Sequence, residues 1–160
     1  MPANHPVAVE ERPSVIEQLQ ANKSTVRDFL TAGLGSGDTR HVAEYLAHGH
    51  VLTGPAKYQE VVGIEGSLEH LDELLAAFPG IDVRVTGMLV SGDQVLAYGR
   101  MRGRHADALV LGDSVFEPTG RVATWRYSVR CRLEDGRIIE TQLGIETARL
   151  MRQLGISFST

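Results

Sequence analysis

The hydrophobic pattern of this chain changes from a helical period to a strand period at Phe78-Pro79-Gly80, and this change constrains the fold more than any other feature of the sequence. Before it, apolar residues recur at helical spacing. After it, they alternate with polar residues, as they do in strands with one buried face. We therefore expect an α+β domain in which N-terminal helices cover one face of a curved, mixed but mostly antiparallel sheet.

Three helices are expected before this change, and a short one at the C-terminal end. Ser14 and Glu17 form a capping box for the first helix, Asp38 can cap the second, and Pro79-Gly80 ends the third. The expected helices cover residues 14–34, 38–46, 66–78 and 147–154. Residues 1–13 carry prolines and no periodic pattern, so we expect a disordered N-terminal arm followed by a single domain over 14–160.

The strands are expected where apolar and polar residues alternate. They cover residues 81–89, 94–105, 122–133 and a last strand that starts at Arg137. Ser91-Gly92-Asp93 and Glu134-Asp135-Gly136 supply the residues that tight turns need. Residues 106–119 follow no clear pattern, and we expect a loop there.

Two of these strands have one apolar side and one basic side, and His105 ends the apolar row of the first. The apolar rows combine small residues with large ones: Ala97, Gly99 and Gly103 with Met101, Trp125 and Tyr127. Glycine inside a strand indicates that something approaches the backbone closely. The pattern favours an apolar pocket with one imidazole at its rim. The alternative is a close-packed core in which helical leucines fill the gaps.

The basic sides consist of arginine rows, and two interpretations of them are open. They can form an anion-binding site, or they can form cross-strand pairs with acidic residues or half of a sheet-to-sheet dimer contact. The second interpretation is the more common one for such rows, and we favour it.

Composition excludes several classes of function. A net charge of −4 and a pI near 5.8 do not fit a general nucleic-acid binder. The single cysteine, Cys131, can form no internal disulfide and no thiolate metal cage. The sequence shows neither a signal peptide nor an apolar stretch of membrane-spanning length, so we expect a cytoplasmic protein with no membrane partner.

Seven short motifs occur in the order and at roughly the spacing of a known family. They are Gly63-Ile64-Glu65-Gly66, Ala77-Phe78-Pro79, Ser91-Gly92-Asp93-Gln94-Val95, the strand ending in His105, Pro118-Thr119-Gly120-Arg121, Glu134-Asp135-Gly136-Arg137-Ile138 and Gln153-Leu154-Gly155. With them, residues 20–155 resemble the SnoaL-like polyketide cyclases of the ketosteroid isomerase and scytalone dehydratase superfamily. The resemblance implies a cone-shaped α+β barrel with a deep pocket and no cofactor, often dimeric through its outer sheet face.

The resemblance also implies ring closure through an enolate, in which a carboxylate removes the proton. Val129 occupies the position where these cyclases usually carry that aspartate, whereas His105 remains at the position of their pocket histidine. The candidate catalytic residues are therefore His105, Tyr127 and Glu140, the last as a replacement acid. The candidate substrate-binding residues are Trp125, Met101, Tyr58, Val129, Gln142 and Thr53, with Tyr58 as a possible lid residue.

We expect a homodimeric tailoring enzyme of natural-product biosynthesis that cyclises or isomerises an apolar, oxygenated small molecule without a cofactor. The alternative is a protein of the same fold that binds or shapes its ligand without catalysis. A third possibility is a metal site formed by His48-Gly49-His50 with His105. We do not favour it, because Gly49 suggests a turn and no acidic ligand follows at a suitable spacing.

Overall fold

The computed structural model describes residues 14–56 and 59–157 and has four α-helices in that part of the chain. The expected arm over 1–13 lies outside the described residues. The α-helices are α1 (Val15–Asp28), α2 (Thr39–Ala43), α3 (Ile64–Ala77) and α4 (Thr147–Gln153). The strands are β1 (Leu46–Thr53), β2 (Val61–Val62), β3 (Asp82–Ser91), β4 (Gln94–Arg104), β5 (Leu109–Leu111), β6 (Ser114–Phe116), β7 (Val122–Glu134) and β8 (Arg137–Ile145).

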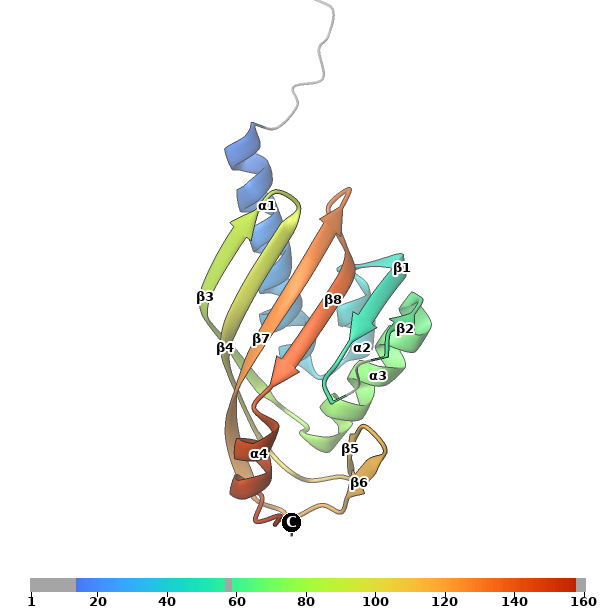
Figure 1. Ribbon diagram of the computed structural model, residues 1–160, viewed down its shortest axis with the longest axis vertical. Coiled ribbons are helices and arrows are strands. Elements are labelled where there is room, and N and C mark those ends of the chain that lie inside the picture. Colours follow the sequence, from blue (N-terminus) through green and yellow to red (C-terminus); the bar gives the residue numbers. More distant parts are fainter. Residues whose placement is uncertain (1–13, 57–58, 158–160) are drawn as a thin grey trace, which may run out of the picture.

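Six strands form one curved sheet in the order β2-β1-β8-β7-β4-β3, in which β1 runs parallel to β8 and every other pair is antiparallel. The α1, α2 and α3 helices lie behind this sheet in Figure 1, and the opposite face of the sheet is uncovered over most of its length. The expected α+β class and mixed sheet are confirmed. The sheet does not close into the barrel that the resemblance implied, because β2 and β3 remain its edges.

The first helix continues past α1 through one π-helical segment, Phe29–Gly33, and one 3₁₀ turn, Leu34–Ser36. It ends at Gly37, which has a φ of 71° that glycine adopts without strain. Gly35-Ser36-Gly37 therefore ends this helix as expected. The change to a π-helical segment has no signature in the apolar spacing, because Phe29, Leu30 and Leu34 stay buried throughout.

Two segments differ from expectation. The second helix ends at Ala43, and His48-Gly49-His50 lies inside β1 rather than in a turn. A register shift between Leu46 and Val51 in the pairing with β8 interrupts the alternation that would have revealed this strand. The expected loop over 106–119 contains the β5–β6 hairpin, whose strands are too short to show a period.

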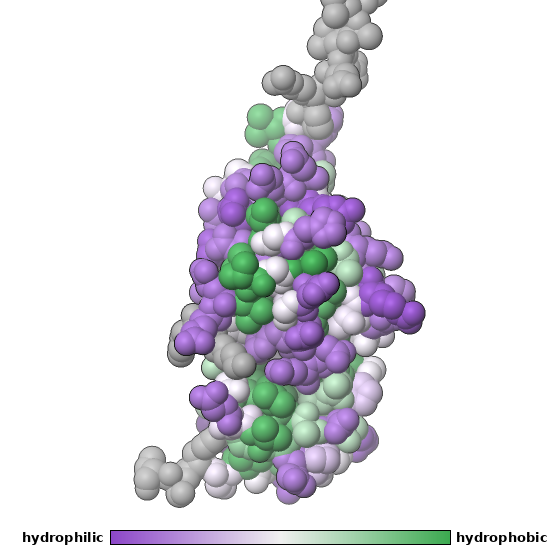
Figure 2. Space-filling view, turned by 90° about the vertical axis from the view of Figure 1, so that its right-hand side faces the viewer, coloured by the Kyte–Doolittle hydropathy of each residue, from purple (hydrophilic) through white to green (hydrophobic). Residues whose placement is uncertain are grey.

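The alternation of β4 and β7 is confirmed residue by residue, with every second side chain buried against the helices and the others exposed. We call these sides the inner and the outer face of the sheet. Figure 2 shows the side of the molecule that carries α3 and β2, where apolar areas are separated by hydrophilic ones. Exposed apolar residues of β2 and β6 are Val62 and Val115. No helix of the described part is long and apolar enough to cross a bilayer.

Candidate functional site

The predicted site residues lie on opposite faces of the sheet, so they do not form one site. Five belong to the inner face and are at most 3% exposed: His105, Trp125, Met101, Tyr127 and Val129. Three others belong to the outer face: Glu140, Gln142 and Thr53. Tyr58, the predicted lid residue, lies outside the described residues.

The room that Gly103 leaves on the inner face is filled by Phe78. Gly103 lies near the end of β4 and is paired with Ala123 of β7, two residues before Trp125. A Cβ atom on Gly103 would lie 2.9 Å from Cβ of Phe78, which follows α3 directly. The Phe78 ring lies 4.8 Å from the Trp125 ring and 5.6 Å from the His105 ring, centroid to centroid. We call Phe78, Gly103, Ala123, Trp125 and His105 the Phe78 cluster.

No water-sized space touches the large side chains of this cluster, since Phe78, Trp125 and His105 are all 0% exposed. The expected open pocket is therefore closed in this structure, and the filler is a phenylalanine rather than a leucine. The sequence correctly indicates a close approach to the backbone at Gly103. It does not indicate whether a ligand or a side chain of the same chain makes that approach.

His105 is held in place through its Nδ1 atom. The Thr119 backbone N–H donates to Nδ1 over 3.2 Å, and the Thr119 hydroxyl lies 3.1 Å from the same atom. In the neutral ring this pattern places the proton on Nε2. Burial lowers the pKa of His105, while backbone groups of Asp107 and Phe116 oppose this shift. The ring is therefore neutral at pH 7 and is a proton donor at Nε2.

Nε1 of Trp125 is a buried N–H group without a hydrogen-bond partner among the described residues. Nε2 of His105 also lacks a hydrogen bond of full geometry, but backbone groups of Asp107 and Phe116 act on this ring as acceptors. A buried donor without a partner costs about 1–3 kcal/mol. Buried polar groups in native proteins are nearly always paired, so the unpaired N–H group of Trp125 needs an explanation.

Tyr127 has a structural partner instead of a free hydroxyl. Its hydroxyl donates to the Arg84 carbonyl oxygen over 2.9 Å. To reach β3 the phenol passes Gly99, its directly paired residue on β4, where any Cβ would collide with that same carbonyl. Burial raises the pKa of Tyr127 to about 12. The predicted catalytic phenol thus remains protonated at neutral pH and holds the irregular β3–β4 pairing in place.

Glu140 pairs with arginines of β7 on the outer face. Its carboxylate lies 3.1 Å from Nε of Arg132 and 3.6 Å from a terminal nitrogen of Arg130. Glu140 therefore lies on the opposite face of the sheet from His105, and the structure does not bring the two predicted catalytic side chains together. Gln142 and Thr53 line a separate hollow of about 510 Å³ on this outer face, together with Leu96, Ser128 and Arg130.

Comparison with known proteins agrees with the curved sheet and its helical cover. The SnoaL-like domain family matches residues 26–141. The chain belongs to the SnoaL-like domain family. Among curated proteins, no match was found.

Solved structures share the SnoaL-like fold over nearly their whole length. A protein of Jannaschia sp. CCS1 described as a SnoaL-like polyketide cyclase is 24% identical, with a TM-score of 0.78 over 92% of this chain and 99% of that one. IdmH of Streptomyces antibioticus, described as a polyketide cyclase, is 24% identical, with a TM-score of 0.70 over 84% and 99%. An LEH-like epoxide hydrolase of M. tuberculosis is 17% identical, with a TM-score of 0.63 over 86% and 91%. At these identities the likeness shows the fold alone.

The SnoaL-like domain also contains a buried polar chain that sequence reasoning missed. The His50 ring lies 2.8 Å from the Ser67 hydroxyl through Nδ1 and 2.8 Å from the Thr141 hydroxyl through Nε2. Cys131 follows, 3.8 Å from the Thr141 hydroxyl. Burial lowers the pKa of His50 to about 4 and raises that of Cys131 to about 12. These contacts connect α3, β1, β8 and β7 in the core, and both ring nitrogens of His50 have a partner.

The same contacts bear on the metal hypothesis for His48-Gly49-His50. His50 has both ring nitrogens occupied and is fully buried, whereas His48 is exposed. Within residues 14–56 and 59–157, no group of three or more His, Cys, Asp or Glu is arranged to hold a metal ion. The only sequence signal for the network was the histidine pair, which gave no indication of Ser67 or Thr141 as partners.

Proposed function

We propose that this SnoaL-like protein binds an apolar, oxygenated small molecule in the place now taken by the Phe78 ring and converts it, without a cofactor, by cyclisation or isomerisation. The observation that carries this proposal is the buried, unpartnered N–H group of Trp125, which lies against the Phe78 ring together with the neutral ring of His105. Two solved relatives of the same fold are described as polyketide cyclases, which supports a substrate of polyketide type.

The chemistry follows from the protonation state of these groups. When an enolate forms, negative charge develops on the substrate oxygen, and fixed N–H donors in a water-free site stabilise it. His105 carries its proton on Nε2, so it serves as a hydrogen-bond donor or general acid rather than as the base. Binding would also give Nε1 of Trp125 the acceptor that it lacks among the described residues.

The base for such a reaction comes from outside the cluster. No aspartate or glutamate of the described residues is buried, and Val129 occupies the position that the resemblance assigns to the catalytic acid. The carboxylate whose charge acts on His105 is that of Asp107, which is exposed. Asp107 is therefore the candidate base once the Phe78 ring moves away.

The missing buried carboxylate also favours a second candidate function. A protein that only binds an oxygenated ligand needs the two N–H donors and no base. In that case the ligand would be held by the Phe78 cluster and released unchanged.

Carbon-acid exchange separates the two functions without knowledge of the natural substrate. 2-Tetralone has acidic α-protons, and its exchange with D₂O can be followed by NMR. The proposed enzyme should accelerate this exchange, and Trp125→Phe, which removes only the N–H group, should slow it about tenfold or more. His105→Ala should slow it by a similar or larger factor. Binding without acceleration would indicate the second function.

Binding itself can be followed through Trp125, because it is the only tryptophan of the chain. Titration with 1-hydroxy-2-acetonaphthone should quench its emission, and Phe78→Ala should strengthen the binding because the ring no longer has to be displaced. If neither the wild-type protein nor Phe78→Ala binds this probe or 2-tetralone, the cluster is only core and the proposed function fails.

A further inference from the structure

Three arginines lie side by side across the outer face of the sheet. Arg84 of β3 is the direct cross-strand partner of Arg100 on β4, and Arg100 is the direct partner of Arg126 on β7. Directly opposed side chains on one face of a sheet lie close together, and like charges in such pairs are destabilising. The row therefore costs stability unless negative charge lies over it.

The chain supplies negative charge to the two ends of the row but not to its centre. Nε of Arg84 lies 3.0 Å from the Asp82 carboxylate, and Nε of Arg126 lies 3.6 Å from that of Glu146. Within the described residues, Arg100 has neither an ion pair nor a side-chain hydrogen bond. The cross-strand pairing expected for the arginine rows is thus found at Arg130 and Arg132 and is missing at Arg100.

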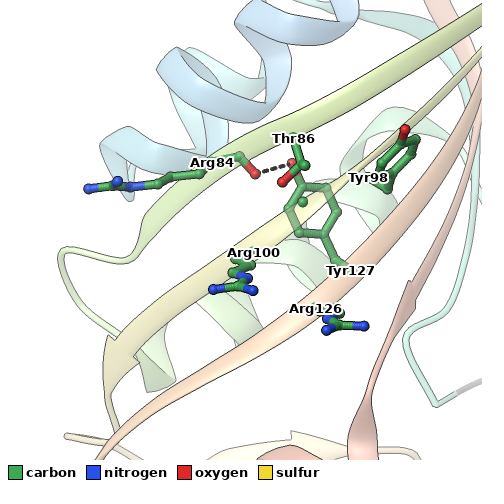
Figure 3. Close-up of a pocket in the computed structure, with 7 residues that line it drawn as sticks. Arg84, Thr86, Tyr98, Arg100, Arg126 and Tyr127 are labelled. Carbon is green, nitrogen blue, oxygen red and sulfur yellow. Dashed lines mark hydrogen bonds between the residues drawn. The ribbon is translucent and has the colours of Figure 1, made fainter.

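A hollow of about 500 Å³ lies at this row. The three arginines line it together with Thr86, Tyr98, Gly99 and Tyr127. Figure 3 labels all of these residues except Gly99. The register shift between Val85 and Gly87 opens the edge of β3 here, and Tyr98 lies across Gly87 with 44% of its surface exposed. Three arginines, a threonine and two tyrosines therefore border one hollow, with Arg100 between Arg84 and Arg126.

We propose that this hollow binds a small organic anion that carries a phosphate or carboxylate group, with Arg100 as its central contact. Arginine is well suited to the planar, two-point recognition of such groups. A bound anion would offset the repulsion that Arg100 feels from its two cross-strand neighbours. Tyr98 offers a surface for the apolar part of the ligand. The site lies on the opposite face of the sheet from the Phe78 cluster. A test of anion binding here is therefore independent of a test of the proposed function.

A small anion fits this row better than a second copy of the chain does. A symmetric contact through the outer face would bring a second arginine row toward the first, with Asp82 and Glu146 already engaged. A small dianion can approach from solvent without bringing positive charge. The homodimer expected through this face becomes an outcome of the test.

The experiment compares the wild-type protein with Arg100→Gln and with Arg102→Gln as a matched control. Arg102 lies on the same strand and face and is exposed, but its cross-strand partners are Asp82 and Thr124, and it does not line the hollow. Binding of inorganic phosphate and of citrate is measured by calorimetry. Thermal unfolding is measured with each anion and with sodium chloride at the same ionic strength.

We expect phosphate or citrate to raise the unfolding midpoint of the wild-type protein more than sodium chloride does. Arg100→Gln should weaken the tighter anion at least about tenfold, whereas Arg102→Gln should change its affinity less than about threefold. Arg100→Gln should also raise the midpoint when no anion is added, because two like-charge contacts disappear. The relative affinities of phosphate and citrate identify which anionic group the site prefers.

Three results would overturn the proposal. In the first, sodium chloride matches phosphate and citrate at equal ionic strength, which means that the row is only screened. In the second, both variants weaken the anions equally, which means that no particular arginine forms a site. In the third, light scattering after gel filtration shows a homodimer that Arg100→Gln dissociates, which means that the face holds a second copy instead.

Discussion

At the scale of single residues, His50 gives the sharpest dependence on pH. Both of its ring nitrogens are hydrogen-bonded in the core, and burial lowers its pKa from 6.5 to about 4. The folded state therefore binds a proton less readily than the unfolded state. The stabilisation is complete above pH 6.5 and is lost as the pH falls toward 4, by about 3 kcal/mol in total.

Urea unfolding of the wild-type protein and of His50→Gln at several pH values between 7 and 4 checks this expectation. The variant should be less stable at pH 7, because one hydrogen bond of the network is lost. Its stability should nevertheless decrease less steeply with falling pH, because no buried imidazole has to be charged. Parallel curves for the two proteins would show that His50 is not the group responsible.

Gly99 and Gly144 test how closely strands approach one another at single positions. A Cβ at Gly99 would collide with the Arg84 carbonyl, which accepts the Tyr127 hydrogen bond. A Cβ at Gly144 would meet nothing closer than the Ser128 hydroxyl, at 3.5 Å. We expect Gly99→Ala to destabilise the protein by about 2 kcal/mol or more. Gly144→Ala should stay within about 0.5 kcal/mol. Equal losses in chemical denaturation would mean that the irregular pairing at β3 adapts freely.

At the scale of elements, the β7–β8 pair carries a surface charge network rather than catalytic groups. Glu140 of β8 contacts Arg130 and Arg132 of β7, and its side chain is 34% exposed. We expect Glu140→Gln to lower the free energy of unfolding by less than about 1 kcal/mol. The loss should shrink further in concentrated salt. The rate at which the protein exchanges the α-protons of 2-tetralone should remain that of the wild type. A large loss of this activity would mean that Glu140 takes part in catalysis after all.

Elements with long periodic patterns could be predicted from the sequence, and short or irregular ones could not. The β4 and β7 strands are long, have one buried side and match their expected ranges within about a residue, because each alternation repeats many times. The β5 and β6 strands span three residues each, too few for any period. In β1 the register with β8 is irregular, and His48 and Gly49 are exposed one after the other. Two successive exposed residues of this kind are typical of a turn, so the sequence did not indicate a strand here.

At the scale of the whole molecule, the sequence predicts where the interior has room but not what fills it. Small residues at Gly99 and Gly103 indicate close approaches, and the structure fills them with the Arg84 carbonyl and with Phe78. The Arg84 carbonyl comes from β3, and its position depends on the irregular register of that strand. The Phe78 ring follows α3 directly, so its position depends on where that helix ends. The Phe78 cluster was therefore only half predictable: His105 and Trp125 were identified, and Phe78 was not.

Val129 tests whether the interior is filled throughout. It lies on the inner face with 1% exposure, at the position where the resemblance places an acid. In a filled core, Val129→Asp buries an unpaired carboxylate and should cost at least about 3 kcal/mol at pH 7. Because such burial raises the pKa of an aspartate, the loss should become smaller as the pH falls toward 4, whereas Val129→Asn should show no such recovery. A loss below about 1 kcal/mol with no dependence on pH would instead mean that solvent reaches Val129, and that this SnoaL-like interior contains the open pocket that the ring of Phe78 otherwise replaces.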